Sequence, residues 1–222
     1  MTTFYAQSYS GSGGFQFDSA EEYHDKYAVW VDRGVEEFEI QVLDGDHGET
    51  DLADALLKRG SFNVDSWYDS VEGLADYEKA ALFWWVDYSG GDDLDEGLAK
   101  VDCCLRVMEG TIEDYAHELI DDLGVENINN PDFYFDFEAF GRDLGFDLDP
   151  DDPDDEYYLS MSDRERGEEY VDSMGGVGEL GKELAARYFD YAALARDLEL
   201  GGDAVPFVFA GSDWVMTTPH EA

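Results

Sequence analysis

The segment from Gly176 to Glu183, GVGELGKE, has the glycine spacing of a phosphate-binding loop. It fits the dinucleotide-binding pattern and most of the P-loop pattern, in which backbone N–H groups and a lysine hold phosphates. Both patterns need a buried strand before the loop, whereas residues 168–174 are predicted to form an acidic helix. Glu183 occupies the place of the magnesium-binding Ser or Thr, and its carboxylate would repel phosphate. The sequence therefore favours an ordinary glycine-rich connection.

Carboxylates with calcium-ligand spacing occur at Asp147, Asp149 and Asp151, which match the first three ligands of an EF-hand loop. The glycine that such a loop needs is replaced by Asp152, and the final glutamate by Tyr158. Loose cation binding is expected here, and no specific metal site is predicted.

Residues typical of catalytic sites are few and dispersed. The chain has 4 histidines, and His117-Glu118 lacks the second histidine of a metalloprotease motif. Its 2 cysteines, Cys103 and Cys104, are neighbours, which rarely form a structural disulfide, so we expect reduced helix residues near the core. No serine-nucleophile elbow is present. The sequence predicts a protein that is not an enzyme and needs no cofactor.

The charge balance excludes several classes of partner. The 222 residues include 55 Asp and Glu against 13 Lys and Arg, a formal net charge of −42. Such a chain has no broad basic face for direct nucleic-acid binding, and anionic membranes repel it. The same charge on duplex DNA would occupy about 71 Å, or about 21 base pairs. Because a compact globule of this length would repel itself strongly, we expect an elongated body with the charge density of a duplex.

The chain is nevertheless predicted to fold, because 44% of its residues are hydrophobic and 15% are aromatic. Its longest apolar run, residues 80–86, is too short to cross a bilayer, and no basic leader precedes it. With only two cysteines, a reduced cytoplasmic location is expected.

Hydrophobic spacing and capping signals predict an α+β fold. An amphipathic helix is predicted from Leu94 to Met108 by apolar residues at three- and four-residue spacing. Further helices are predicted over residues 19–31, 74–88 and 112–123, and strands over 4–9, 15–17, 38–42, 205–209 and 214–216, the last two as a hairpin.

A repeat occupies the last ninety residues. YFDFEAFGRDL at 134–144 returns as YFDYAALARDL at 188–198, each after an acidic helix, with an acidic connector at 147–156 between them. We predict an elongated multi-domain chain whose units cover residues 1–60 (α+β), 61–110 (helical), 111–160 (first repeat copy) and 161–222 (second copy with the terminal hairpin).

Residues 134–144 resemble the aromatic segment of the ArdA antirestriction family. Residues 37–41, which follow an aromatic strand and a Ser-Gly turn, and the acidic helix at 115–124 extend the likeness over about residues 1–146. The resemblance implies an elongated, often dimeric protein, whose carboxylates imitate the phosphates of bent B-form DNA. It implies binding to the DNA site of type I restriction-modification enzymes, on the methyltransferase and specificity subunits, and protection of incoming mobile-element or phage DNA in the host bacterial cytoplasm. The second copy departs from the family pattern.

The residues assigned to this partner-binding role are carboxylates on predicted helix faces and in the connector. Their field is collective, so no single one should dominate. They are Asp92, Asp93, Asp95, Glu96, Glu113, Asp114, Glu118, Asp121, Asp122, Asp147, Asp149, Asp151, Asp152, Asp154, Asp155 and Glu156.

Two alternatives remain open from the sequence. An ordinary protein of a halophile is also acidic and poor in lysine, but it needs molar salt to fold. A calcium-responsive acidic interaction protein is the other alternative, and the incomplete EF-hand loop weakens it.

Overall fold

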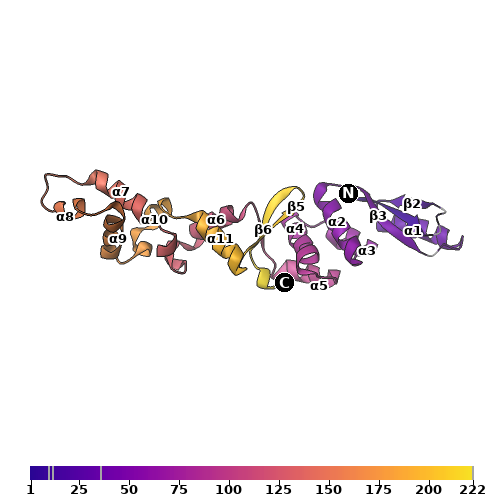
Figure 1. The fold of residues 1–222 in the computed structure, drawn as a ribbon. Helices are drawn as coiled ribbons and strands as arrows, with labels where there is room; N and C mark the ends of the chain where they lie inside the picture. Colours follow the sequence, from indigo (N-terminus) through magenta and orange to yellow (C-terminus); the bar gives the residue numbers. More distant parts are fainter. Residues whose placement is uncertain (10, 12, 36, 222) are drawn as a thin grey trace. The chain divides into compact units, whose positions relative to one another are not determined.

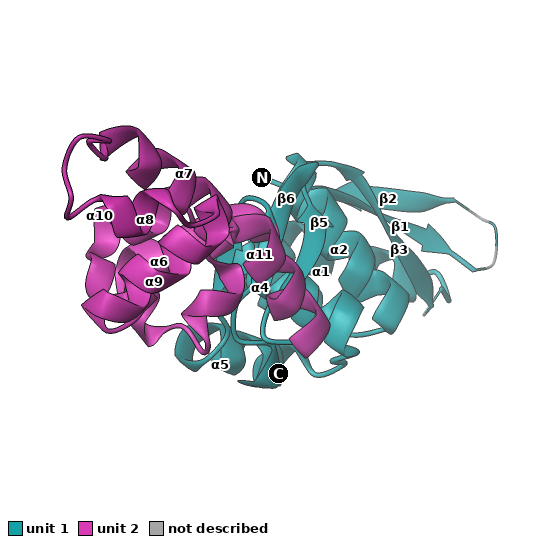
Figure 2. Cartoon of the chain, turned by 60° about the vertical axis from the view of Figure 1, so that its left-hand side comes forward, with its two compact units in different colours: residues 1–111, 202–222 teal, residues 112–201 magenta. Residues whose placement is uncertain are grey.

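The computed structural model describes residues 1–9, 11, 13–35 and 37–221. It divides the chain into two compact units, each with its own hydrophobic core (Figures 1 and 2). Unit 1 comprises residues 1–111 and 202–222, and unit 2 comprises residues 112–201. Both aromatic copies thus belong to unit 2, whereas the terminal hairpin belongs to unit 1. The finer division into four segments stays a prediction.

Unit 1 begins with a three-stranded antiparallel sheet of order β2-β1-β3. The strands are β1 (Thr3–Ser8), β2 (Gly14–Phe17) and β3 (Phe38–Asp44). Alternate residues of β1 are fully buried, and its Phe4 stacks on the cross-strand Phe17 with ring centroids 5.5 Å apart. Helix α1 (Ala20–Val31) begins at Ser19, whose side chain accepts from the N–H of Glu22, as the capping signal predicts.

The remainder of unit 1 combines helices with a second sheet of order β4-β6-β5. A cluster of aromatic and aliphatic side chains, including the fully buried Trp67, joins both sheets to the helices in one core. The elements are α2 (His47–Arg59), α3 (Val64–Ser66), the π-helical turns η1 (Trp67–Val71) and η2 (Trp85–Ser89), α4 (Asp76–Trp84), α5 (Leu94–Cys103), β4 (Val107–Glu109), β5 (Val205–Phe209), β6 (Ser212–Met216) and the 3-10 turn η6 (Pro219–Glu221).

The helix predicted from Leu94 to Met108 is too long. Helix α5 ends at Cys103, and β4 follows and pairs with β6, where Met108 faces Val215 in the register. The apolar spacing continues across the boundary through the buried Leu105 and the partly buried Met108, although in the strand it is Val107 that packs against the core. Periodicity alone therefore could not locate the end of the helix.

The cysteine expectation is also wrong. Cys103 and Cys104 are joined by a disulfide, with Cα atoms 3.8 Å apart. Cys103 is exposed at the last residue of α5 and Cys104 follows outside the helix. The helix end frees the backbone from helical geometry at this position, so the two side chains can turn toward each other.

A buried ion pair lies inside unit 1. The side chains of Glu49 and Lys79 are 5% and 6% exposed and lie 3.3 Å apart. The hydroxyl of Thr2 donates to Glu49 (2.8 Å), and the N-terminal amine lies 3.4 Å from the same carboxylate. Burial alone raises the pKa of Glu49, but the hydrogen bond from Thr2 and the charge of Lys79 outweigh it and hold the pKa below its ordinary value.

Replacing Glu49 by Gln is expected to cost about 3 kcal/mol of folding free energy at pH 7, because Lys79 is left charged and buried. Since the folded-state pKa of Glu49 is lowered, its contribution is full at neutral pH and disappears as the pH falls through that pKa. Urea unfolding of wild type and E49Q should therefore differ at pH 7 and converge at acid pH. The double variant E49L/K79M is the control and should recover part of the lost unfolding free energy. A difference in unfolding free energy between wild type and E49Q that does not change with pH would contradict the role of the ionised Glu49.

Unit 2 is helical, with the two aromatic segments at its centre. Its elements are α6 (Ile112–Leu123), η3 (Val125–Asn127), η4 (Pro131–Tyr134), α7 (Phe137–Asp147), α8 (Glu156–Leu159), α9 (Asp163–Met174), η5 (Val177–Leu180), α10 (Lys182–Arg187) and α11 (Tyr191–Gly201). The glycine-rich segment follows helix α9 and forms η5, as expected for a connection and not for a nucleotide loop. In the described part of the chain, no helix combines the length and apolarity required to cross a membrane.

Helices α7 and α9 pack backbone against backbone. A Cβ atom added to Gly141 would lie 1.7 Å from the carbonyl oxygen of Asp163, and one on Gly167 would lie 2.2 Å from that of Phe137. The buried guanidinium of Arg166 adds a second link, because it donates to the carbonyl of Gly141 (2.8 Å). Two glycines facing each other thus allow this close crossing.

Candidate functional site

The assigned carboxylates of unit 1 surround the beginning of α5. Asp93 is the N-cap, and its Oδ1 accepts from the N–H groups of Asp95 (3.0 Å) and Glu96 (3.1 Å). Asp92 and these three residues are all exposed. Acids in the first turn are stabilised by the positive end of the helix dipole, so the helix itself favours this charge cluster.

The assigned carboxylates of α6 lie on its solvent side. Ala116 and Ile120 are fully buried, whereas the carboxylates are exposed: Glu113, Asp114, Glu118, Asp121 and Asp122. The ammonium of Lys182 lies 3.5 Å from Asp121 Oδ1. The amphipathic pattern of the sequence therefore gives the orientation of this helix correctly.

The connector from Asp147 to Glu156 is folded by its own side chains. Asp155 Oδ2 accepts from the N–H of Asp149 (2.8 Å), and Asp149 and Asp152 each accept from the N–H two residues later. Asp155 is half-buried and the other acids of the connector are exposed. Among the described residues, no group of three or more His, Cys, Asp or Glu side chains is arranged to hold a metal ion.

The assigned residues thus fall in two places. Asp92 to Glu96 belong to unit 1, and the acids of α6 and the connector belong to unit 2. Within unit 2 the charges lie on segments that the two aromatic copies position.

The two copies pair with each other around an approximate two-fold axis. Phe135 and Phe189 form an antiparallel bridge. The N–H of Asp136 donates to the carbonyl of Tyr188 (2.8 Å), and the N–H of Asp190 donates to that of Tyr134 (2.6 Å). Because each bond has its counterpart from the other copy, the repeat seen in the sequence is a pseudo-symmetric pair in space.

Side chains follow the same symmetry. The hydroxyl of Tyr134 donates to Asp197 (3.1 Å), and that of Tyr188 donates to Asp143 (2.7 Å), so each tyrosine reaches the aspartate of the other copy. Burial raises the pKa of both tyrosines, and the hydrogen bonds to the carboxylates raise it further. Both hydroxyls therefore stay protonated donors at neutral pH.

The helices are exchanged between copies in the same way. The aromatic helix of the first copy, α7, packs on the acidic helix of the second, α9, and α11 packs on α6. At the N-termini of the two aromatic helices, Asp136 accepts from Ala139 N–H (2.9 Å) and Asp190 from Ala193 N–H (3.0 Å). Neither copy buries its apolar face by itself, so the pair is the folding unit.

Sequence reasoning did not assign the residues of this pairing. The 54-residue offset relates Tyr134 to Tyr188 and Asp143 to Asp197, and that signal could have paired them. The arginine of the first copy also pairs with acids inside unit 2. Arg142 lies 3.3 Å from Glu138 and 3.6 Å from Asp163, because the Asp136 carboxylate is used as the cap of α7.

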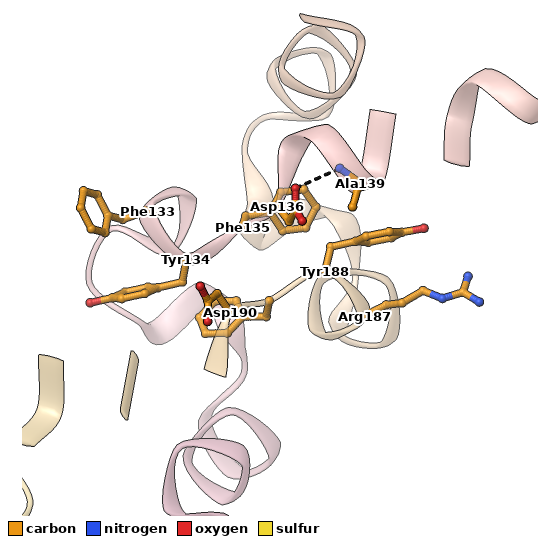
Figure 3. A pocket seen from close by; sticks show the side chains of 9 residues that line it. Phe133, Tyr134, Phe135, Asp136, Ala139, Arg187, Tyr188 and Asp190 are labelled. Atoms are coloured by element: carbon orange, nitrogen blue, oxygen red, sulfur yellow. Dashed lines mark hydrogen bonds between the residues drawn. The ribbon is translucent and has the colours of Figure 1, made fainter. Parts of the chain in front are cut away.

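A shallow groove of about 430 Å³ lies on the solvent side of the bridge. Figure 3 shows Tyr134 and Tyr188 at its opposite ends with Asp136 and Asp190 between them. Phe135 and Phe189, 6% and 7% exposed, form its floor. The groove combines flat aromatic surfaces with two carboxylates that the helix caps hold in place.

Taken together, the fold and this surface define an acidic α+β protein with exposed carboxylates in both of its units. A family model described as Antirestriction protein (ArdA) matches residues 16–157. Because the match covers more than half of the chain, the chain belongs to the ArdA family, and an antirestriction function follows. The match includes the first aromatic segment and ends before the second. No curated protein and no solved structure matches the chain.

Proposed function

We propose that the chain inhibits type I restriction-modification enzymes by occupying their DNA-binding site, on the methyltransferase and specificity subunits. Its exposed carboxylates take the place of DNA phosphates and engage the lysines and arginines that otherwise bind them. It performs no catalysis, binds no nucleic acid itself, and acts in the bacterial cytoplasm to protect incoming mobile-element or phage DNA. A homodimer stays a prediction of the family resemblance.

The observation that supports this proposal is that the assigned carboxylates, apart from the half-buried Asp155, are exposed on ordered segments. Those of α5 and α6 are fixed to helices, and the connector is folded by backbone N–H groups that donate to Asp149, Asp152 and Asp155. A surface ordered before binding loses little conformational entropy when it binds. Little of the electrostatic binding free energy is therefore offset by the cost of ordering.

The proposal predicts displacement of DNA and a steep salt dependence. Unlabelled chain added to a type I enzyme bound to labelled duplex should release the duplex. In a direct titration of labelled chain into the enzyme, the dissociation constant should rise at least about tenfold between 50 and 200 mM salt, because such contacts release counterions. No displacement at low salt would contradict the proposal.

The same samples distinguish the proposed DNA mimic from an ordinary halophilic protein. Far-UV circular dichroism should show the folded helices at 50 mM salt. A chain that folds only in molar salt would favour the halophilic interpretation instead.

A further inference from the structure

The groove between the two aromatic copies has a chemistry that the acidic surface around it lacks. In an extended bridge, side chains alternate between faces. Phe135 and Phe189 fill the core side, and the solvent side presents a tyrosine and an aspartate from each copy. The groove therefore consists of two equivalent halves, Tyr134 with Asp190 and Tyr188 with Asp136 (Figure 3).

Each half combines an aromatic face with a carboxylate. The halves are held together by the reciprocal backbone bonds, since the N–H of Asp190 donates to Tyr134 and that of Asp136 to Tyr188. Capping a helix uses one bond of each aspartate, and an ionised carboxylate has about four acceptor sites, so capacity remains for a ligand.

This combination selects guanidinium over ammonium groups. A guanidinium is planar, stacks on aromatic rings and pairs with carboxylates, whereas an ammonium is a compact and strongly hydrated charge. The chain's own Arg187 lines one end of the groove, but its guanidinium points away from Asp136 and Asp190 (Figure 3). Asp143 and Asp197, bonded to the two tyrosine hydroxyls, add further negative charge.

We propose that this groove is an anchor site for arginine side chains of the partner protein, one in each half. The inference rests on the proposed function, since a DNA-binding surface supplies exposed arginines. It adds a localised contact to the collective field: arginine and tyrosine are the residues that most often carry a disproportionate share of interface affinity.

The test uses two double variants with the same change in charge. D136N/D190N removes both groove carboxylates, and because asparagine caps helices as well as aspartate does, α7 and α11 should keep their N-caps. D172N/E199Q removes two exposed charges of unit 2 that lie outside both the groove and the assigned set, and it is the matched control. Circular dichroism and unfolding midpoints should match wild type for both.

The groove variant should bind a type I enzyme about tenfold more weakly than wild type, and the control variant should change by less than about twofold. Equal losses in the two variants would overturn the anchor and leave the collective mechanism in place.

A second measurement is independent of any restriction enzyme. Full-length wild type is titrated with a hexa-arginine and a hexa-lysine peptide, and amide NMR shifts are followed at residues 134–136 and 188–190. Hexa-arginine should shift these signals at lower concentration than hexa-lysine, and D136N/D190N should abolish the difference. Shifts of equal size with both peptides would refute guanidinium selectivity. If hexa-arginine shifts these amide signals but the chain does not displace DNA from the enzyme, the proposed function is wrong and the guanidinium-binding role of the groove is retained.

Discussion

Replacing ten assigned carboxylates of unit 2 by amides should weaken binding to a type I enzyme by more than about 1000-fold and abolish antirestriction. The size follows from counterion release, because six to ten phosphate contacts lose about 10³ to 10⁵ in affinity when salt rises from 50 to 200 mM, and removing the charges should cost a comparable factor. Each Asp→Asn or Glu→Gln change keeps the acceptor oxygen that the local turns use. The ten positions are Glu113, Asp114, Glu118, Asp121, Asp122, Asp147, Asp151, Asp152, Asp154 and Glu156.

The control is a variant with ten neutralised acids in unit 1, so that the formal net charge rises from −42 by the same amount. These are exposed acids outside the assigned set, namely Glu21, Asp25, Asp32, Glu37, Glu39, Asp54, Asp69, Asp76, Asp87 and Glu109. The control should retain most of the inhibition, and any one of the unit 2 changes alone should cost less than about threefold. If the two variants with ten substitutions each lost binding equally, the net charge and not the assigned surface would be responsible.

Gly141→Ala is expected to destabilise unit 2 by more than about 3 kcal/mol, a large effect for a single methyl group. The added Cβ would overlap the carbonyl oxygen of Asp163, and the overlap involves backbone on both sides, so no side-chain rotation relieves it. Helices α7 and α9 would have to separate, which would also break the bond from Arg166 to the carbonyl of Gly141.

The position of the tryptophans makes this loss measurable unit by unit. All 5 tryptophans, Trp30, Trp67, Trp84, Trp85 and Trp214, belong to unit 1, so their fluorescence reports that unit alone. In G141A, the helical signal in circular dichroism should be lost at lower urea than in wild type, while the fluorescence transition stays in place. Gly73→Ala, where an added Cβ meets nothing within 4 Å, is the control and should change stability by less than about 0.5 kcal/mol. A G141A variant as stable as wild type by circular dichroism would contradict the close crossing.

Local signals in the sequence predicted several elements and their ends, although the thirteen-residue helix α2 was not predicted. Ser19 caps α1 through Glu22, and Gly90 ends the helix that precedes it with a φ of 85°. The predicted hairpin is present, but its second strand begins at Ser212, two residues earlier than predicted, after a two-residue turn at Ala210-Gly211 in which both residues have positive φ. These features depend on residues close to one another in the chain, so a single sequence contains the information for them.

Composition and hydrophobic spacing also predict the chemical class of the surface. With a net charge of −42 and few lysines, most carboxylates have no partner that would allow them to be buried, so they must be exposed. In α6 the apolar stripe faces the core, so its acids face solvent. The exposed carboxylates of the assigned set follow from this constraint without knowledge of the tertiary fold.

The pairing of distant segments could not be predicted from the sequence and became visible in the fold. Strand β4 has a partner more than one hundred residues away, and without β6 its residues continue the spacing of α5. The repeat was visible in the sequence, but the exchange of helices, with α7 on α9 and α11 on α6, was not. The groove, with its two tyrosines and two aspartates, exists only because two segments 54 residues apart meet at Phe135 and Phe189. Which distant segments pair depends on which apolar faces fit together when the chain folds back on itself. Local hydrophobic periodicity contains no information about that fit.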